Sequence, residues 1–510
     1  MIISLPNEIQ LEIFYALHSS DATQIVKQDT LHAVSHVCRR WRHLSTSTSI
    51  FWTYILVKKR SVDLSVHFDD PVLVEETHTS LIFPWVSTLL RRSGTKPIDV
   101  RITLQSNSFN PSWSEARNWS QFSWSPGHAV ILSRILATHA ARLRTVEILS
   151  DVWQPIQDLG AALVDVPMPL LQAWDVTRDY LHWSYPAHND LELDATMPAI
   201  ECPLRINPST ELNARMYPNL RILTLQGVPQ NWDRLIPRNL VELDLKYVPL
   251  NRRPDPEALR ALLLGSQFSL QSLTLWAAAP LRGDHVKITL PNLKTLSLGF
   301  SFLHTAINLT TYLEVPNLSS LEIYDMTNNE DSVLMTEDLY MHMIDHWPLK
   351  QLTQLTLRSP SFPESDYDDL EDAFAEYREV DSPLPILLNF LLQCSSVKKV
   401  HFIDPDIASL RALVTVSPVN HQGFPGQTLA CSSLDLLQIE TSPAQFVALD
   451  DEFSRHNESW FGVAPRAVDT ILLDVLPGCE YKLRSFLSTY HLARLVLNKR
   501  KRVFRDSFFF

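Results

Sequence analysis

The chain has little glycine and no long apolar run. Eleven of its 510 residues are glycine, which excludes collagen-like and glycine-rich low-complexity structures. No run of about 18 apolar residues occurs, so no membrane-spanning helix is expected. The start, MIISLPNEIQ, lacks the basic and apolar regions of a secretory signal. We expect a cytoplasmic or nuclear protein with no membrane partner.

Cysteines are few, and the common catalytic motifs are missing. The five cysteines are far apart and include no C-x-x-C, so neither a disulfide framework nor a zinc ribbon is indicated. G-x-S-x-G, G-x-x-x-x-G-K-[ST], G-x-G-x-x-G and H-E-x-x-H are all missing. His342 and His346 lie one helical turn apart, but no third ligand accompanies them. The sequence predicts no catalytic residue, no metal site and no cofactor, hence a protein that is not an enzyme.

Positive charge is sparse in the body of the chain. The net charge is −13, and residues 1–60 and 494–510 carry excesses of +3 and +5, which leaves −21 between them. Nucleic acid binding requires a basic footprint, so nucleic acid is not expected as a partner. Protein partners are favoured.

A leucine pattern, L-x-x-L-x-L, recurs through the middle of the chain. It begins at 220, 240, 270, 293, 318 and 352, with Ile323 in the last slot of the fifth copy. Leu223 and Leu225 alternate with Ile222, Thr224 and Gln226, as in a strand with one buried face. Weaker copies begin at 143, 171, 397, 434, 468 and 492.

Helical segments are expected between these strands. Residues 255–265 have an Asp cap, a proline in the first turn, an apolar stripe and a final glycine. Further helices are expected at 128–143, 332–346 and 384–394. Pro-Asn-Leu at 218, 291 and 316 separates helix from strand. Copies 20 to 34 residues apart are typical of a solenoid whose single units cannot bury their own apolar faces.

This pattern resembles leucine-rich repeats, although the asparagine or cysteine that normally follows the strand is missing. We therefore expect no asparagine ladder and a less regular array. The predicted fold class is α/β, with a small N-terminal helical domain followed by an irregular leucine-rich-repeat-like solenoid.

Two amphipathic helices are predicted before the array. In the first, Leu5, Ile9, Ile13 and Leu17 form an apolar stripe beside Phe14, after a Ser4 cap with Pro6 and Glu8 in the first turn. After a polar loop at about 18–30, the second has apolar residues at 31, 34, 37, 38, 41 and 44. So short a unit cannot hide this much apolar surface alone, so a partner or the first repeat must cover part of it.

The identities in these helices resemble the F-box domain. The matching residues are Leu5, Pro6, Glu8, Ile9, Ile13, Phe14, Leu17, Val37, Cys38, Trp41, Phe51 and Trp52. The resemblance implies that these residues bind a Skp-type adaptor and, through it, a cullin-RING ubiquitin ligase. It also implies a division between that interface and the domain's own core for seven of them: Leu5, Pro6, Ile9, Ile13, Val37, Trp41 and Trp52. The stretch SGTKPIDVRITL at 93–104, a predicted strand, also resembles fungal F-box proteins with repeat-like C-terminal halves.

The expected domains are an F-box at 1–57, a helical linker or cap at 58–97 and a solenoid at 98–497. Within the solenoid, 218–360 is the most regular part and 364–381 is an acidic insert with nine carboxylates against one arginine. Residues 498–510 form a basic and aromatic tail.

Two functions remain open at this point. The first is a substrate receptor that brings an unknown target protein to a ubiquitin ligase. The second is a repeat-based binding scaffold with no ligase link, whose N-terminal helices serve only as a solenoid cap. In the first case we expect target contacts at residues projecting from the strands: Asp244, Lys246, Trp276, Tyr324, Arg358 and His401.

Overall fold

A computed structural model gives the fold of two compact units. It describes residues 5–18, 24–58, 82–104, 126–150, 153–161, 163, 166–178, 216–228, 230–232, 237–281, 286–327, 333–359, 386–405, 409, 412, 416–419, 425–429, 431, 433–440, 470–475 and 495–499. The first unit comprises Met1–Tyr185 with Asp194–Arg252, and the second Pro186–Leu193 with Arg253–Phe510. Each unit is described by itself.

The first unit begins with a group of helices. They are α1 (Asn7–His18), α2 (Gln24–Val37), α3 (Arg39–Ser47) and the 3₁₀ turn η2 (Ser49–Trp52). The first helix starts two residues later than a Ser4 cap would place it, because the carbonyl of Pro6 accepts the hydrogen bond of the Gln10 amide and Pro6 therefore lies just outside the helix. The expected Ser4 cap lies outside the described residues.

Two expectations for these helices are wrong. The predicted loop at 24–30 is instead the first part of α2, which begins at Gln24 and buries Leu31 and Val34 further along. The predicted second helix is also two helices. Cys38 has extended backbone angles and caps α3, its Sγ accepting the Trp41 amide at 3.4 Å, so the chain changes direction there.

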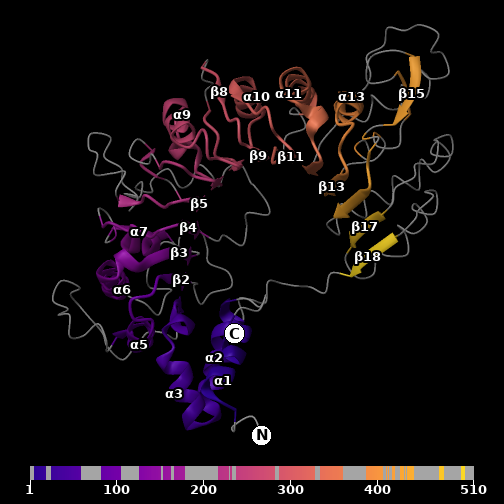
Figure 1. Cartoon of the computed structure of the whole chain (residues 1–510). Coiled ribbons are helices and arrows are strands. Elements are labelled where there is room, and N and C mark those ends of the chain that lie inside the picture. The colour runs from indigo at the N-terminus through magenta and orange to yellow at the C-terminus, as the bar shows by residue number, and fades with distance from the viewer. Residues whose placement is uncertain are drawn as a thin grey trace. The chain divides into compact units, whose positions relative to one another are not determined.

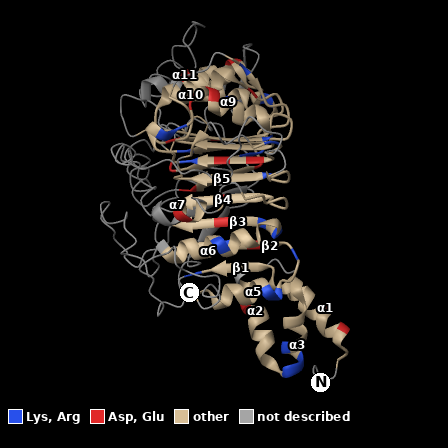
Figure 2. Ribbon diagram, turned by 90° about the vertical axis from the view of Figure 1, so that its left-hand side faces the viewer, with Lys and Arg blue, Asp and Glu red and all other residues tan. Residues whose placement is uncertain are grey.

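Parallel strands and helices complete the first unit. In order along the sheet the strands are β1 (Tyr54–Val57), β2 (Ile98–Leu104), β3 (Leu143–Ser150), β4 (Ala173–Arg178), β5 (Ile222–Gln226) and β6 (Glu242–Lys246). The helices between them are α5 (Pro84–Arg92), α6 (Pro126–Thr138) and α7 (Trp153–Ala161), with short 3₁₀ turns η6 (Ala140–Arg142) and η9 (Leu250–Arg252). Figure 2 shows β1 to β5 following one another, with α1 to α3 at the β1 end.

The second unit has the same design. Its parallel strands are β7 (Ser272–Trp276), β9 (Thr295–Phe300), β11 (Ser320–Asp325), β12 (Gln354–Arg358), β13 (Lys399–Ile403), β16 (Leu436–Glu440), β17 (Thr470–Val475) and β18 (Leu495–Lys499). Its helices are α9 (Pro256–Gly265), α10 (Leu303–Tyr312), α11 (Val333–His346), the turn η11 (Leu349–Gln351) and α13 (Ile386–Gln393). Two small strand pairs, β8 (Ile288–Thr289) with β10 (Leu313–Glu314) and β14 (Val416–Val419) with β15 (Pro425–Leu429), lie beside the sheet.

The leucine pattern determines which side of each strand is buried. In β5 and β7 buried and partly exposed residues alternate, with Leu223, Leu225, Leu273 and Leu275 inside. Helices α9, α10, α11 and α13 lie along one side of the strands of their unit in Figure 1. The strands confirm all six main copies of the pattern and all six weaker ones. An N-terminal helical domain followed by an all-parallel sheet with interleaved helices agrees with the expected leucine-rich-repeat-like α/β solenoid.

Asparagine side chains join successive repeats where no ladder was expected. In three Pro-Asn-Leu copies the Nδ2 donates to a carbonyl of the preceding repeat: Asn219 to Pro169 at 2.7 Å, Asn292 to Phe268 at 2.6 Å and Asn317 to Pro291 at 2.8 Å. These asparagines stand before the strand rather than after it. The expectation that no asparagine ladder forms concerned an asparagine after the strand, and these contacts do not contradict it.

Several strands end in a residue with left-handed backbone angles. Tyr247, Ala277, Ser359 and Asp404 have φ between 48° and 54° immediately after β6, β7, β12 and β13. The amides of Ala277, Ser359 and Asp404 donate to the neighbouring strand at 2.7 to 2.8 Å. This conformation disfavours side chains with a Cβ by about 1–2 kcal/mol, so these hydrogen bonds compensate part of a local strain.

Some predicted segments fall outside the described residues. These are the acidic insert at 364–381, most of the tail at 498–510 and two of the five cysteines, Cys202 and Cys479. Cys394 and Cys431 are buried and unbridged, and Cys38 is partly exposed. None of the described helices is both long enough and apolar enough to cross a membrane.

The hydrogen bond of Asn292 gives a first prediction. We expect Asn292→Ala to lower the free energy of unfolding of the second unit by about 1 kcal/mol, because the Phe268 carbonyl loses its partner. Thermal unfolding followed by circular dichroism measures this loss. Asn251→Ala, at an exposed asparagine in η9, serves as the control, and an equal effect of both substitutions would contradict the role assigned to Asn292.

Candidate functional site

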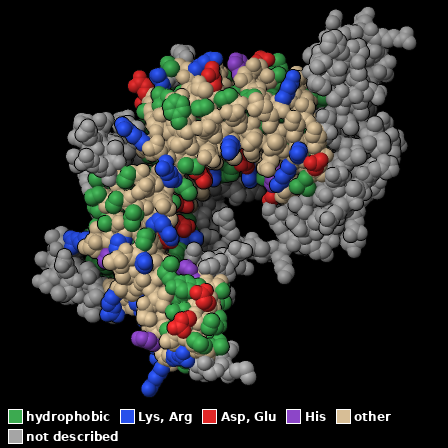
Figure 3. Space-filling model, in the orientation of Figure 1, with side chains coloured by type: hydrophobic (Ala, Val, Ile, Leu, Met, Phe, Trp, Pro, Cys, Tyr) green, Lys and Arg blue, Asp and Glu red, His purple; other side chains and the backbone are tan. Residues whose placement is uncertain are grey.

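One side of α1 carries an exposed apolar stripe. Ile9, Ile13 and Leu17, here called the α1 stripe, recur every four residues and are 48%, 38% and 39% exposed. Gln10 and Phe14 are buried. Figure 3 shows hydrophobic and acidic side chains gathered over this group of helices. The stripe is therefore partly exposed to solvent.

Aromatic packing beneath α1 holds the stripe outward. The Phe14 ring meets the Trp41 ring edge-on at 5.2 Å between centroids and lies 6.4 Å from that of Phe51. Trp52 is buried, and its Nε1 donates to the Ser45 carbonyl at 2.7 Å. These side chains form the inner core of the helical group, and this core fixes the rotation of α1.

A second aromatic stack joins the helical group to α5. The His32 ring of α2 lies 4.5 Å from the Trp85 ring and 5.7 Å from the Trp52 ring, and the Arg92 guanidinium lies 4.6 Å from the Trp52 centroid. Burial is the main cause that lowers the pKa of His32. Arg92 lowers it further, Asp29 opposes this, and His36 adds a small lowering effect. The neutral imidazole is thus the form that this stack favours.

In the second unit, three predicted target-contact residues come together on the strand face, the side of the sheet opposite the helices. The rings of Trp276 and Tyr324 pack edge-on at 5.3 Å, and the Arg358 guanidinium lies 5.2 Å from both centroids. We call Trp276, Tyr324 and Arg358 the strand platform. They lie on β7, β11 and β12, which are separated in sequence by up to 82 residues (358 − 276).

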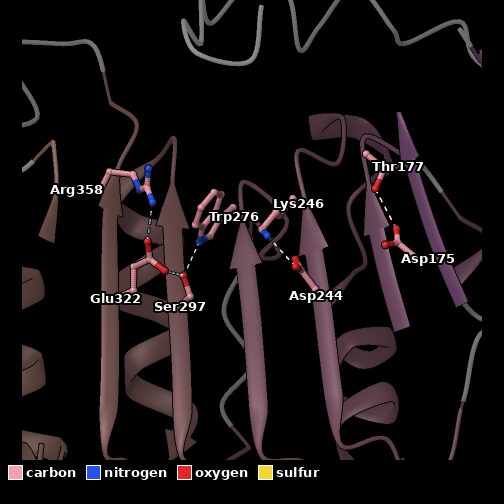
Figure 4. Close-up of polar contacts among 8 residues, drawn as sticks. All are labelled: Asp175, Thr177, Asp244, Lys246, Trp276, Ser297, Glu322 and Arg358. Atoms are coloured by element: carbon pink, nitrogen blue, oxygen red, sulfur yellow. Dashed lines mark hydrogen bonds and ion pairs between the residues drawn. The ribbon is translucent and has the colours of Figure 1, made fainter. Parts of the chain in front are cut away.

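Hydrogen bonds fix the geometry of the strand platform, as Figure 4 shows. Trp276 Nε1 donates to Ser297 Oγ at 2.6 Å, and Ser297 Oγ donates to Glu322 Oε2 at 2.8 Å. The other Glu322 oxygen accepts from Arg358 Nη2 at 3.1 Å. The chain of contacts closes on itself, because Arg358 also lies over the Trp276 ring.

Gly299 makes room for the indole. It stands between Trp276 and Tyr324 in the register of the sheet. A Cβ at this position would lie 2.9 Å from two carbon atoms of the Trp276 ring and 3.0 Å from Met326 Cε. Glycine is therefore required here for the ring to lie flat across β9.

The other predicted target-contact residues lie elsewhere on the strand faces. Asp244 and Lys246 pair on β6 of the first unit, with Nζ 2.7 Å from Oδ2. His401, on β13 next to β12, has Nε2 at 3.6 Å from Glu440 Oε2. The structure thus brings three of the six residues together.

The strand face of the first unit is rich in carboxyl groups. Glu147, Asp175, Thr224 and Asp244 occupy one row of the register across β3 to β6. Burial raises the pKa of Asp175 to about 6; the Thr177 hydroxyl and Arg101 oppose this rise, whereas Glu147 and Asp244 add to it.

Among the described residues, no group of three or more His, Cys, Asp or Glu side chains has an arrangement that could hold a metal ion.

The comparisons with known proteins concern the N-terminal helices. Residues 2–58 match the F-box-like family model. F-box proteins are generally non-catalytic adaptors, and the domain implies binding to a Skp-type adaptor. A search among curated proteins gave no match for the chain.

Within the F-box-like domain, the twelve residues expected to form its core and adaptor surface fall into three groups. The exposed ones are Pro6, Glu8, Ile9, Ile13, Leu17 and Val37. The partly buried ones are Leu5, Cys38 and Trp41. The buried ones are Phe14, Phe51 and Trp52, which are placed to support a surface rather than to form it. An adaptor contact by any of these residues stays a prediction.

Sequence reasoning missed residues at both places. Tyr15, Val26 and Ile50 are further exposed apolar side chains of the domain. On the strand platform, Ser297, Gly299 and Glu322 were missed. Ser297 and Glu322 fill the slot between the last two leucine positions of their copies, so aligning the copies would have placed them side by side.

The stack around His32 predicts a pH dependence. A folded-state pKa below 6.5 means that the folded chain binds fewer protons than the unfolded chain as pH falls through 6.5. Stability contributed by neutral His32 is therefore complete above that pH and declines below it. We expect His32→Phe, which retains an aromatic ring against Trp52 and Trp85, to lose less melting temperature between about pH 7.5 and pH 5 than the unsubstituted chain. Equal losses would contradict the role of His32.

Proposed function

We propose that this protein is a substrate-recognition subunit of an SCF-type cullin-RING ubiquitin ligase. Its F-box-like domain binds the Skp-type adaptor, and its strand faces bind a target protein. The observation that carries the proposal is the exposed α1 stripe within the segment that matches the F-box-like model.

The stripe is a costly feature for a chain without a partner. Burying an apolar side chain completely is worth about 1.5–3 kcal/mol, yet Ile9, Ile13 and Leu17 keep 38–48% of their surface exposed while Phe14 of the same helix is buried. An exposed apolar patch on a rigid support is typical of a protein-binding surface. The buried aromatic residues give the support, and the stripe gives the contact area.

The proposal assigns the chemistry to other subunits. The receptor contributes by holding its target near the ubiquitin-loaded enzyme, which raises the effective concentration of the target lysines. The proposed division of the chain remains an F-box at 1–57, a linker at 58–97, a repeat array at 98–497 and a tail at 498–510.

The alternative is a repeat scaffold whose N-terminal helices are only a cap. One observation favours it, because the His32, Trp85 and Arg92 stack packs these helices against α5. That stack, however, uses α2 and η2 and leaves the α1 stripe exposed. A cap and an adaptor-binding surface can therefore coexist on different sides of the same domain, and adaptor binding separates the two functions.

A substitution in the stripe tests the proposal. We expect Ile13→Glu to weaken binding of the full chain to a purified Skp-type adaptor by about tenfold or more, because a carboxylate would be desolvated in an apolar contact. Isothermal titration calorimetry measures the affinity.

The matched control is Leu264→Glu, which places the same charge at a helix residue of similar exposure, 41%, in the second unit. It should leave adaptor affinity unchanged. If the unsubstituted chain does not bind the adaptor, or if Ile13→Glu binds as tightly as the control, the receptor function is refuted and the cap function remains.

A further inference from the structure

The strand platform is organised before any partner arrives. Both Glu322 oxygens are engaged, one by Ser297 and one by Arg358, and the Trp276 indole is held by Ser297 on its nitrogen. The side chains of Glu322 and Arg358 are 25% and 30% exposed. A partner would therefore meet a fixed surface formed by the two aromatic rings and the Arg358 guanidinium, and little conformational entropy is lost when such a surface binds.

The two aromatic rings of the platform already have a cationic group beside them. The guanidinium of Arg358 lies equally far, 5.2 Å, from the centroids of Trp276 and Tyr324. The negative faces of aromatic rings attract cations. Because Glu322 compensates the charge of Arg358, the platform itself has no excess of positive charge to repel a second cation.

Carboxyl groups lie near the platform, among them Asp404 after β13 and the buried Asp325 at the end of β11. Burial is the main cause that raises the pKa of Tyr324; Arg358 opposes the rise, and the carboxyl groups of Asp404 and Asp325 add to it. Glu440 lies on β16, two strands beyond Arg358, next to His401. An anionic segment would meet this negative potential, whereas a cationic segment would be attracted by it.

We propose that the strand platform is the anchor for the target, and that it binds a lysine- or arginine-bearing segment of a protein through its aromatic rings and the carboxyl groups around them. This rests on the proposed receptor function and adds the chemical class of the partner. A phosphorylated or acidic segment is excluded by the same charges.

Short labelled peptides test the charge preference. The full chain is titrated against fluorescein-labelled peptides of about 12 residues in which glycine and serine alternate with arginine and lysine, with glutamate, or with phosphoserine. We expect the basic peptide to bind about tenfold or more tightly than either anionic peptide, and its affinity to fall as salt rises.

Substitutions test whether the platform is the site. Trp276→Ala should weaken binding of the basic peptide about fivefold, through loss of the ring that faces the cation. Gly299→Ala is the second variant: it retains the indole but displaces it, because the new Cβ would contact the ring. The matched control is Phe268→Ala, which removes an aromatic side chain of the same unit that is 76% exposed, and it should bind the peptide as the unsubstituted chain does.

Equal binding of basic and anionic peptides, tighter binding of the phosphoserine peptide, or no binding at all overturns the proposal. Binding that is unchanged in both Trp276→Ala and Gly299→Ala overturns it as well. Adaptor binding is measured on the same variants and should remain intact. A chain that binds the basic peptide but not the adaptor would refute the receptor function alone.

Discussion

The burial of leucine between strands and helices is the constraint on which the rest of the structure depends. A single strand with its helix cannot remove its own apolar side chains from water, so each repeat is stable only against its neighbours. Leu223, Leu273, Leu296, Leu321 and Leu355 are all essentially inaccessible. Since side chains alternate along a strand, fixing these residues inside also fixes which residues project on the other face. The chemistry of the strand platform follows from this alternation.

Much of the fold could be predicted from this alternation, and even the register follows from the pattern. Aligning the copies on their leucines puts Ser297, Glu322, Thr356 and His401 in one row, and the strands pair in that way. What the pattern could not show is side-chain conformation. Whether Trp276 lies across β9 depends on Gly299 in the next repeat, and a glycine among strand residues gives no signal of its own in a single sequence.

The N-terminal helices show a different limit of sequence reasoning. Polarity at 24–30 indicated a loop, yet these residues form the start of α2, whose Leu31 and Val34 are buried. The spacing of Cys38 predicted that it continues the apolar stripe of one helix. In the structure its backbone is extended, and its sulfur caps the next helix. In the stripe of α1 the spacing was right, and whether Ile9 or Phe14 is covered depended on how α3 and η2 pack. The spacing of apolar residues indicates which face of a helix is apolar, but not which element packs against that face.

The asparagines before the strands also bear on how such an array can change. In these repeats the asparagine side chain hydrogen-bonds to the preceding repeat just before a strand starts, as Asn292 does to the Phe268 carbonyl and Asn317 to the Pro291 carbonyl. The segments that connect one strand to the next differ in length from repeat to repeat. Copies of the pattern 20 and 34 residues apart can thus belong to arrays of one design, and new residues can be inserted in the connections during evolution while the rows of projecting side chains stay in place.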